Sequence, residues 1–413
     1  MRTRTQGYKT ELKVNNKQRT MLVKHCGAAR FTYNWGLAQK KEAYESGSEE
    51  KLNAISLHRK LNSLKKEEFP WLYEVSKCSP QEALRDLDKA YAGFFRKCKS
   101  KKSGEKPGFP RFKSKHDSKQ SFRLTGSIKV LDENHIQLPR LGKLKVKEKG
   151  YLPSEVKILS ATVSCVADRW FVSLQVQEEV PSTSFGISDL ILGVDLGIST
   201  LATPSKGDPF QNPKALKNKL EKLQRLSRSL SRKKKGSNNR AKAKKKLAKL
   251  HYQISCIRRD AIHQMTTTLV KAKPKAIVVE DLAVPNMLKN KRLSRSLADS
   301  SFGEIRRQLE YKCDWEGIEL VLADRFFPSS KRCSGCGNIK KELKLSTRTY
   351  VCEECGLSLC RDYNAALNLV WWYENVFSIP KVHSGINACG DVPLGTSMKQ
   401  ESNKNFELRN TSV

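Results

Sequence analysis

The sequence predicts a multidomain protein that combines α+β and α/β architecture, and three observations lead to this prediction. The chain has 413 residues, of which 38% are hydrophobic, which is enough for the cores of about two to four domains. In the first half, helical apolar spacing gives way to alternating spacing, which predicts helices beside a small antiparallel β-barrel or sheet. In the second half, apolar strands alternate with helical segments, which predicts an α/β domain.

A strand followed by helices is expected at the N-terminus. The stretch YKTELKV, residues 8–14, alternates polar and apolar side chains and therefore predicts a strand. Helical spacing follows from residue 17 to about residue 44, and again over residues 57–64. Because the lone first strand joins the later sheet most economically, residues 16–103 are predicted to be a helical insertion.

The third helix of this insertion is expected to begin at the sequence SPQE. Ser79 can cap the helix, Pro80 suits its first turn, and Glu82 can complete a capping box. After this helix, alternating patterns such as KLKVKE and RWFVSLQVQEE predict antiparallel strands. The antiparallel domain is predicted to comprise residues 1–15 and 104–186.

A new domain is expected after the polar linker PSTSFGISD. The stretches LILGVDLGISTLATPS and KAIVVEDLAV predict buried strands, and a helical hairpin with the turn RKKKGSNNR lies between them. Lys and Arg crowd this hairpin, which favours contact with nucleic-acid backbones over a merely solvated coiled hairpin. The α/β domain is predicted at residues 187–328 and 358–380, and the polar residues 381–413 are expected to form a loose tail.

The charge of the chain indicates a polyanionic partner. The sequence holds 78 Lys and Arg against 42 Asp and Glu, which gives a formal charge of +36 and a pI near 9.8. Nucleic acid is the partner that this balance favours, and a solvated basic surface or an anionic membrane patch is the alternative. No apolar run approaches the length of a bilayer span and no signal-peptide pattern opens the sequence. We therefore expect a soluble protein of the cytoplasm that does not contact a membrane.

Four of the twelve cysteines have the spacing of a metal site. Cys333 and Cys336 form one CxxC motif, and Cys352 and Cys355 form another after fifteen intervening residues. Two such pairs can supply the four thiolates of a tetrahedral zinc site, and four protein ligands leave no open position, so the ion should be structural. A zinc ribbon is predicted at residues 329–357. The other cysteines are expected to be free thiols, and Cys360 is expected to pack rather than to bind the metal.

Carboxylates at the ends of apolar segments form a second constellation. Asp195 lies in ILGVDLGIST, Glu280 ends AIVVE, and Asp362 begins the helix that follows the second CxxC. Singly, each could be a helix cap or an ion-pair partner. Together they suggest the acidic cluster of an RNase H-like nuclease, in which oxygen ligands hold two Mg²⁺ ions for hydrolysis of a phosphodiester.

A family resemblance rests on the motifs GVDLGISTLAT, VVEDLAV, KRCSGCG, VCEECGL and RDYNAALNL in this order. With the N-terminal stretches YKTELKVNNKQRTMLVKHCGAARFTYNWGL and SPQEALRDLDKAYAGFF, they resemble TnpB (OrfB), the RNA-guided nuclease family encoded by insertion sequences and related to type V CRISPR effectors. The resemblance covers nearly the whole chain up to about residue 380.

The resemblance implies a wedge-like β-barrel interrupted by a helical recognition lobe, then a RuvC-type RNase H-like nuclease domain with an inserted zinc ribbon. It implies that Asp195, Glu280 and Asp362 are catalytic and bind two Mg²⁺ ions, or Mn²⁺ in their place. It further implies a guide RNA from the transposon end, double-stranded target DNA beside a short adjacent motif, and a monomer on the RNA. The location implied is the prokaryotic cytoplasm, in association with the nucleoid.

The chain departs from the family pattern at one position, and at three others it matches the family only by region. The family commonly has an acid two residues before the third catalytic one, and here that position is Cys360. Gln81, Lys113 and Ser121 match regions of the family that face the duplex beside the target, so they are predicted nucleic-acid contacts. The alternative for these three residues is ordinary capping or phosphate contact.

Three other functions remain open on the sequence alone. The same scaffold could bind DNA under RNA guidance, or repress, without cleaving. The stretch DLGIST also resembles a phosphate loop of actin-like and sugar-kinase folds, although that interpretation leaves the cysteines and the basic hairpin unexplained. A strand-transferring transposase would share the acids. His25 and His263 are expected to be packed or solvated rather than general bases, and Trp371, Trp372 and Tyr373 are expected in the core.

Overall fold

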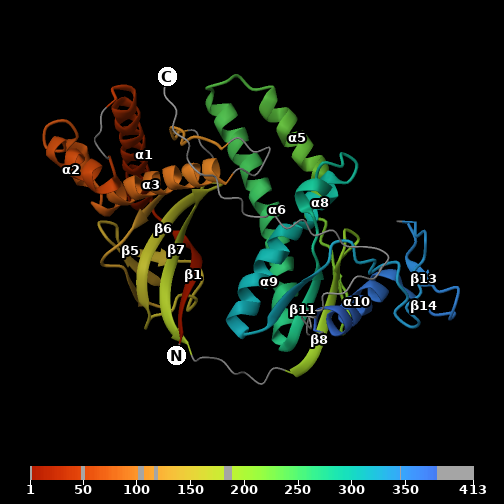
Figure 1. Ribbon diagram of the computed structural model, residues 1–413. Coiled ribbons are helices and arrows are strands. Elements are labelled where there is room, and N and C mark those ends of the chain that lie inside the picture. The colour runs from red at the N-terminus through yellow and green to blue at the C-terminus, as the bar shows by residue number, and fades with distance from the viewer. Residues whose placement is uncertain are drawn as a thin grey trace, which may run out of the picture.

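The computed structural model describes residues 2–47, 52–100, 107–115, 120–180, 188–344 and 346–378. The predicted tail at 381–413 lies outside the described residues, as does most of the predicted linker, residues 181–187. Figure 1 shows two sheets with helices around each of them, and a small third sheet at the end of the molecule opposite α1 and α2.

The N-terminal half contains four helices and seven strands within the described residues. They are β1 (Arg2–Lys13), α1 (Asn16–Glu45), α2 (Ala54–Leu64), the 3-10 helix η1 (Pro70–Glu74), α3 (Cys78–Lys99), β2 (Gln120–Leu124), β3 (Lys129–Asp132), β4 (His135–Leu138), β5 (Gly142–Val146), β6 (Lys157–Val166) and β7 (Arg169–Val180).

These seven strands form one antiparallel sheet in the order β2-β6-β7-β1-β5-β4-β3. Strand β1 lies between β7 and β5, with Thr10 opposite Val172 and Leu12 opposite Val146. The first strand therefore joins the later strands, as the sequence predicts. Closure of this sheet into a barrel stays a prediction.

Helices α1, α2 and α3 share one hydrophobic core with this sheet (Figure 1). Leu22 of α1 and Leu84 of α3 are fully buried in the same cluster as Leu124 of β2 and Val172 of β7. Burial of such side chains contributes about 1.5–3 kcal/mol each, so the helices are fixed to the sheet by packing.

The predicted cap of α3 is wrong. The helix begins at Cys78, and its N-cap Lys77 makes no side-chain capping hydrogen bond. Ser79 instead donates from Oγ to the carbonyl oxygen of His25 at 3.2 Å, and Glu82 pairs with Arg85. Because this end of α3 is buried against α1, the serine hydroxyl bonds to the neighbouring helix rather than to its own helix end.

The C-terminal half contains the remaining elements of the described residues. They are β8 (Ser188–Leu196), β9 (Thr200–Pro204), β10 (Phe210–Gln211), α4 (Ala215–Asn218), α5 (Leu220–Ser231), α6 (Asn238–Lys271), β11 (Pro274–Glu280), α7 (Val284–Met287), α8 (Ser294–Ser300), α9 (Phe302–Glu316), β12 (Glu319–Ala323), β13 (Thr349–Val351), β14 (Ser358–Cys360), α10 (Arg361–Trp372) and the π-helix η2 (Tyr373–Phe377).

The five-stranded sheet has the order β10-β9-β8-β11-β12. Strands β10, β9 and β8 pair antiparallel, whereas β8, β11 and β12 pair parallel. Side chains of a strand point alternately to its two faces. Ile277 and Val279 of β11 accordingly pack with α6 and α9, while Ala276 and Val278 pack with α10. The sheet is thus the middle layer between helices on both faces.

The predicted basic hairpin forms beside this sheet, and its first arm is divided into two helices. The first arm consists of the short helix α4 and then α5, because the backbone breaks at Lys219. The second arm, α6, continues down to the sheet and packs on it (Figure 1). Within the part of the chain that the structure describes, no helix combines the length and the apolar character that crossing a membrane requires.

Candidate active site and metal centre

Asp195 and Glu280 lie side by side on neighbouring parallel strands. Val194 of β8 is the register partner of Val279 of β11, so the two acids come one residue later on strands about 4.8 Å apart. Because side chains along a strand alternate between its two faces, every second residue of β11 points the same way. Ala276 and Val278 point towards α10, so Glu280, two residues further on, points there too. The two carboxylates therefore meet at the α10 face of the sheet.

Helix α10 brings the third acid to this edge. Gly193, two residues before Asp195, packs directly against the helix backbone, since a Cβ on it would lie 2.1 Å from the carbonyl oxygen of Ala366. Asp362 is in the first turn of the same helix. Close contact at Gly193 thus sets the helix at a distance where its N-terminal end reaches the ends of β8 and β11.

The three acids line one cavity of about 600 Å³. Burial, and then the charges of Glu280 and Asp362, raise the pKa of Asp195 well above its usual value, while Arg361 acts in the opposite direction. Carboxylates gathered in this way repel each other unless a cation or a proton compensates. Arg348 and Arg361 also line the cavity, so it presents both metal-binding oxygens and cationic groups that suit phosphate.

Two of the acids are held by neighbouring side chains. The hydroxyl of Ser329 donates a hydrogen bond to Oε1 of Glu280. The guanidinium of Arg361 lies 3.2 Å from Oδ1 of Asp362, and both side chains are largely buried. The carboxylates are thus oriented by the protein itself.

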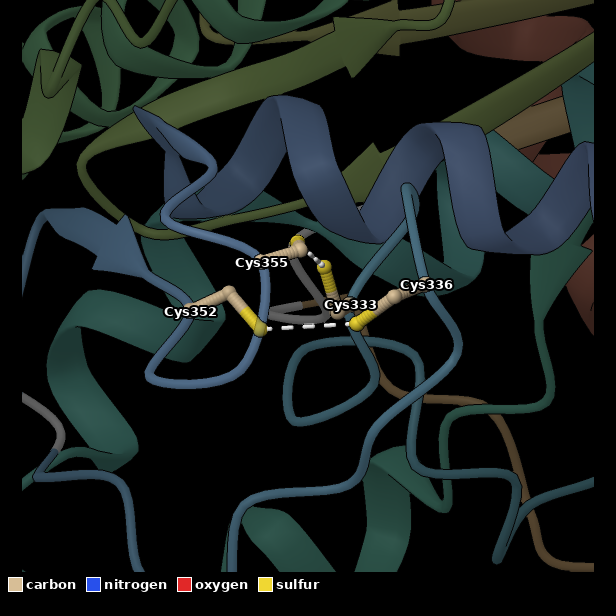
Figure 2. A group of neighbouring side chains, drawn as sticks. All are labelled: Cys333, Cys336, Cys352 and Cys355. Carbon is tan, nitrogen blue, oxygen red and sulfur yellow. Dashed lines mark hydrogen bonds between the residues drawn. The ribbon is translucent and has the colours of Figure 1, made fainter.

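The four cysteines of the two CxxC motifs form a compact centre. Figure 2 shows their sulfurs pointing toward one another from two loops, and all four lie within 4.8 Å of one another. The Sγ atoms of Cys333 and Cys355 are 3.6 Å apart, and those of Cys336 and Cys352 are 3.5 Å apart. Tetrahedral zinc with bonds of about 2.3 Å requires edges of about 3.8 Å. The four residues therefore fit such an ion.

The two loops of this centre have the same backbone design. The amide of Gly337 donates to the carbonyl of Cys333 at 3.0 Å, and the amide of Gly356 donates to that of Cys352 at 3.1 Å. Both glycines have positive φ, 81° and 71°, a conformation in which a side chain is strained. The glycine after each CxxC therefore lets the chain turn back around the sulfurs.

Cys360 lies outside this centre and is exposed at the end of β14. The prediction that it packs is wrong, because within the described residues its side chain is exposed on the two-stranded sheet of β13 and β14. Among the described residues, the four cysteines form a close group of metal-binding side chains, whose sulfur atoms lie within 4.8 Å of one another. The three carboxylates line a separate cavity.

Comparisons with known proteins match almost the whole chain. Residues 173–291 match a family model described as "Probable transposase" (OrfB_IS605), residues 302–369 match "Cas12f1-like, TNB domain", and residues 1–49 match "Helix-turn-helix domain". A Streptomyces pristinaespiralis protein named "Putative RNA-guided DNA endonuclease" is 37% identical over 361 residues, 86% of each chain. This chain belongs to the TnpB (OrfB) family. A protein of Escherichia coli K12 named "Putative RNA-guided DNA endonuclease InsQ" is 34% identical over 96% of this chain and 97% of its own length.

The fold of this TnpB-family chain is similar to that of a solved nuclease complex. The structure titled "Cryo-EM structure of the Cas12f1-sgRNA-target DNA complex" aligns with a TM-score of 0.50 and 15% identity, covering 89% of this chain and 98% of that one. At this identity the similarity concerns the fold alone. It supports the predicted mixed α and β architecture.

The three predicted nucleic-acid contacts of this TnpB-family chain lie away from the acidic cavity. Gln81 is half-buried on α3 and Ser121 is exposed on β2. The Nζ atom of Lys113 lies 3.8 Å from the ring centroid of Tyr33, and Asn34 holds the Lys113 backbone through two hydrogen bonds. None of the three lines the cavity of the acids, and their role stays a prediction.

Two basic cavities lie on either side of α6. A groove of about 760 Å³, here called the hairpin groove, has four cations and one acid among its lining residues: Arg169, Lys222, Lys246, Lys249 and Asp168. A cavity of about 990 Å³ between β1 and the helices α6 and α9 is lined by five cations and one acid: Lys9, Arg258, Arg259, Arg307, Lys312 and Glu304. Both have the charge that contact with phosphates requires.

The structure also reveals site residues that the sequence patterns do not indicate. Ser329 bonds to Glu280, and Asn364 and Asn368 lie fully buried one helical turn apart on α10. The signal that could have identified them is the pair of asparagines in RDYNAALNL, because a buried amide needs partners. The histidines and aromatic residues agree with expectation: His25 is buried, and Trp372 and Tyr373 pack in a core with Trp371 against it.

Proposed function

We propose that this chain is an RNA-guided DNA endonuclease of an insertion sequence. Its guide would be an RNA from the transposon end, and it would hydrolyse phosphodiesters of guide-matched, double-stranded DNA beside a short adjacent motif. The names of the relatives support this proposal, as does the similar fold of a Cas12f1 complex with guide RNA and target DNA. The formal charge of +36 is suited to gripping such polyanions by their backbones.

The observation that carries the proposal is the gathering of Asp195, Glu280 and Asp362 around one cavity. They come from segments far apart in the chain, and burying three carboxylates together is costly unless they serve a cation. The sheet supports an RNase H-like, RuvC-type domain, because its first three strands pair antiparallel, whereas β11 pairs parallel with β8, the strand that bears Asp195, and β12 pairs parallel with β11.

The carboxylates have the oxygen chemistry to hold two Mg²⁺ ions, or Mn²⁺ in their place. Such ions, when bound, activate water and stabilise the leaving oxygen of an in-line phosphodiester hydrolysis. The chain itself contributes orientation: Ser329 holds Glu280 and Arg361 holds Asp362. Arg348 lines the same cavity and can neutralise charge on the scissile phosphate.

The remaining parts are assigned by the same proposal. We take residues 1–15 and 104–186 as a wedge-like β-barrel, 16–103 as a helical recognition lobe, and 187–328 with 358–380 as the nuclease domain. A ribbon at 329–357 would hold one structural Zn²⁺, because four thiolates leave no open position for substrate. We expect one protein copy per guide RNA in the prokaryotic cytoplasm.

Membership of the TnpB family decides against the kinase alternative. Guided binding without cleavage and strand transfer are separated from hydrolysis by one experiment. The protein is purified with its copurified RNA, the RNA is sequenced, and a matching DNA library is incubated with Mg²⁺. Asp195→Ala should abolish cleavage while guided DNA binding persists, because the basic grooves are unchanged. The matched control is Asp189→Ala, an exposed acid on the same strand.

Each outcome of this experiment is decisive. Hydrolysed DNA ends in the wild type and their loss in Asp195→Ala support the nuclease. Binding with intact DNA in the wild type would favour a guided repressor, and joined DNA products would favour a transposase. Cleavage that survives in Asp195→Ala would refute the assignment of the site.

A further inference from the structure

Ser329 is a buried residue that joins two parts of the acidic site. Its side chain is 2% exposed, and its hydroxyl donates to Oε1 of Glu280 at the end of β11. Its carbonyl oxygen accepts a hydrogen bond of 2.8 Å from Nδ2 of Asn368 on α10. One residue therefore bonds both to a carboxylate of the cavity and to the helix that bears Asp362.

Asn368 fixes the backbone next to Ser329 as well. Its Nδ2 also donates to the carbonyl of Arg332 at 2.6 Å, and its Oδ1 accepts from the Arg332 guanidinium at 2.8 Å. This amide is fully buried and all of these bonds go to the segment 329–332. Breaking one of these hydrogen bonds would leave a buried polar group unpaired, which costs about 1–3 kcal/mol. The segment is therefore held firmly against α10.

The same segment continues into the four-cysteine centre. One turn earlier on α10, Asn364 donates to the carbonyl of Arg332 at 2.7 Å and accepts from the amide of Ser334 at 2.9 Å. Cys333, fully buried, lies between these two residues. The cysteine centre thus anchors the far end of the segment whose near end holds Glu280.

We propose that Ser329 is a positioning residue for the metal site: its hydroxyl engages Oε1 of Glu280 and leaves Oε2 for a metal ion. Asn368 holds Ser329 in place, so that Glu280 and Asp362 keep a fixed relation although they come from different layers. This inference rests on the proposed function of the acidic cavity. Outer hydrogen-bonding partners of metal ligands typically contribute about 10–100-fold to metal affinity or activity.

The test measures Mn²⁺ dependence in the full-length protein with its copurified RNA. Ser329→Ala should raise the Mn²⁺ concentration for half-maximal DNA cleavage about tenfold, with the wild-type rate regained at saturating Mn²⁺. Ser329→Thr keeps the hydroxyl and should return the midpoint to within about threefold of the wild type. The matched control is Ser358→Ala, an exposed serine on β14, which should leave the midpoint unchanged.

A second readout does not depend on cleavage. Mn²⁺ binding is followed by electron paramagnetic resonance. The titration of Asp195→Ala is subtracted, because it measures the Mn²⁺ that binds to the RNA and to the protein surface rather than to the acidic cavity. Ser329→Ala should weaken the remaining binding about tenfold. An unchanged affinity and midpoint, even with a lowered melting temperature, would overturn the proposal, because Ser329 would then serve stability alone.

A double-mutant cycle tests the part that Asn368 plays. Asn368→Ala should raise the Mn²⁺ midpoint too, and adding Ser329→Ala should raise it by less than the sum of the single effects, since both act through one hydroxyl. Additive effects would refute the link through Ser329. If Asp195→Ala binds Mn²⁺ as tightly as the wild type, the acidic cavity is not the metal site and the proposed function fails. If only Ser329→Ala is without effect, this inference alone fails.

Discussion

Gly193 on β8 contacts the backbone of Ala366 on α10 with no room for a side chain. A Cβ on Gly193 would lie 2.1 Å from the Ala366 carbonyl oxygen and 3.1 Å from Cβ of Leu369. The strand carries Asp195 two residues later, and the helix carries Asp362 in its first turn. The distance between two acids of the cavity therefore depends on the absence of a methyl group.

Gly193→Ala should displace α10 and impair both folding and the site. Overpacking of this kind lowers the free energy of unfolding by about 1–3 kcal/mol. The displacement of Asp362 should also lower the cleavage rate of the molecules that remain folded. Thermal unfolding and the cleavage rate at a temperature where the variant is folded measure the two effects. Gly303→Ala, at a position with no atom within 4 Å of the new Cβ, is the control. Wild-type stability and cleavage in Gly193→Ala would contradict the packing argument.

Asp195→Asn should stabilise the metal-free protein. The pKa of Asp195 is raised by burial and by two carboxylates, so the folded state binds more protons here than the unfolded state. The free energy of unfolding must then fall as pH rises from the usual aspartate pKa towards the raised one. At neutral pH without divalent metal, the amide should raise the melting temperature by about 2 °C or more.

The same pair of proteins should respond to metal to different extents. Mg²⁺ should raise the melting temperature of the wild type, since a ligand of the folded state stabilises it, and should raise that of Asp195→Asn much less. Asp189→Asn, exposed on the same strand, should behave as the wild type. Identical melting curves of wild type and Asp195→Asn with a chelator, from acid to neutral pH, would show that the acids do not destabilise each other.

Cys352→Ser should remove the structural metal. The wild type should carry about one zinc ion per chain, and the variant should lose most of it together with stability, because zinc binding supplies folding free energy to such small modules. Cys360→Ser is a close control, since Cys360 lies eight residues later and outside the centre. Zinc content by elemental analysis decides the matter: full zinc in Cys352→Ser, or loss of zinc in Cys360→Ser, would contradict the ligand set.

The sequence predicts most accurately where a short pattern fixes the geometry. The spacing of the cysteines predicts their cluster, because each CxxC with its glycine is a self-contained turn. The apolar runs before Asp195 and Glu280 predict the buried strands β8 and β11 that carry these acids. The predicted joining of the first strand to the later sheet is also confirmed.

Long-range packing sets the limits of such prediction. Ser329 and Asn368 are separated by 39 residues, and only the folded arrangement of β11 and α10 brings them together. Local motifs also mislead where burial overrides them: the capping pattern at Ser79 gives way to a bond with α1. Cys360 is exposed at the end of β14, which no local pattern of the sequence indicates.

The hairpin groove should contribute to nucleic-acid affinity through its charge. Lys246 and Lys249 are exposed on α6 and line this groove beside Tyr252. If both contact phosphates of a duplex, Lys246→Gln with Lys249→Gln should reduce the slope of log affinity against log salt concentration by up to about 2 units, and by less for a single strand. Affinity should fall for all sequences alike, because phosphate contacts carry no sequence information.

Binding of guide RNA and of target DNA is measured separately at several salt concentrations. The nucleic acid for which the groove variant changes the slope of log affinity against log salt concentration is the partner of the groove. The control replaces Lys271 and Lys275, which are also exposed but line neither basic cavity, and it makes the same change in net charge. If the control reduces the slope equally, the long-range field of the whole chain accounts for the effect. If neither variant changes it, the groove does not hold phosphate. A change confined to the groove variant, and seen with RNA alone, would assign this surface to the guide.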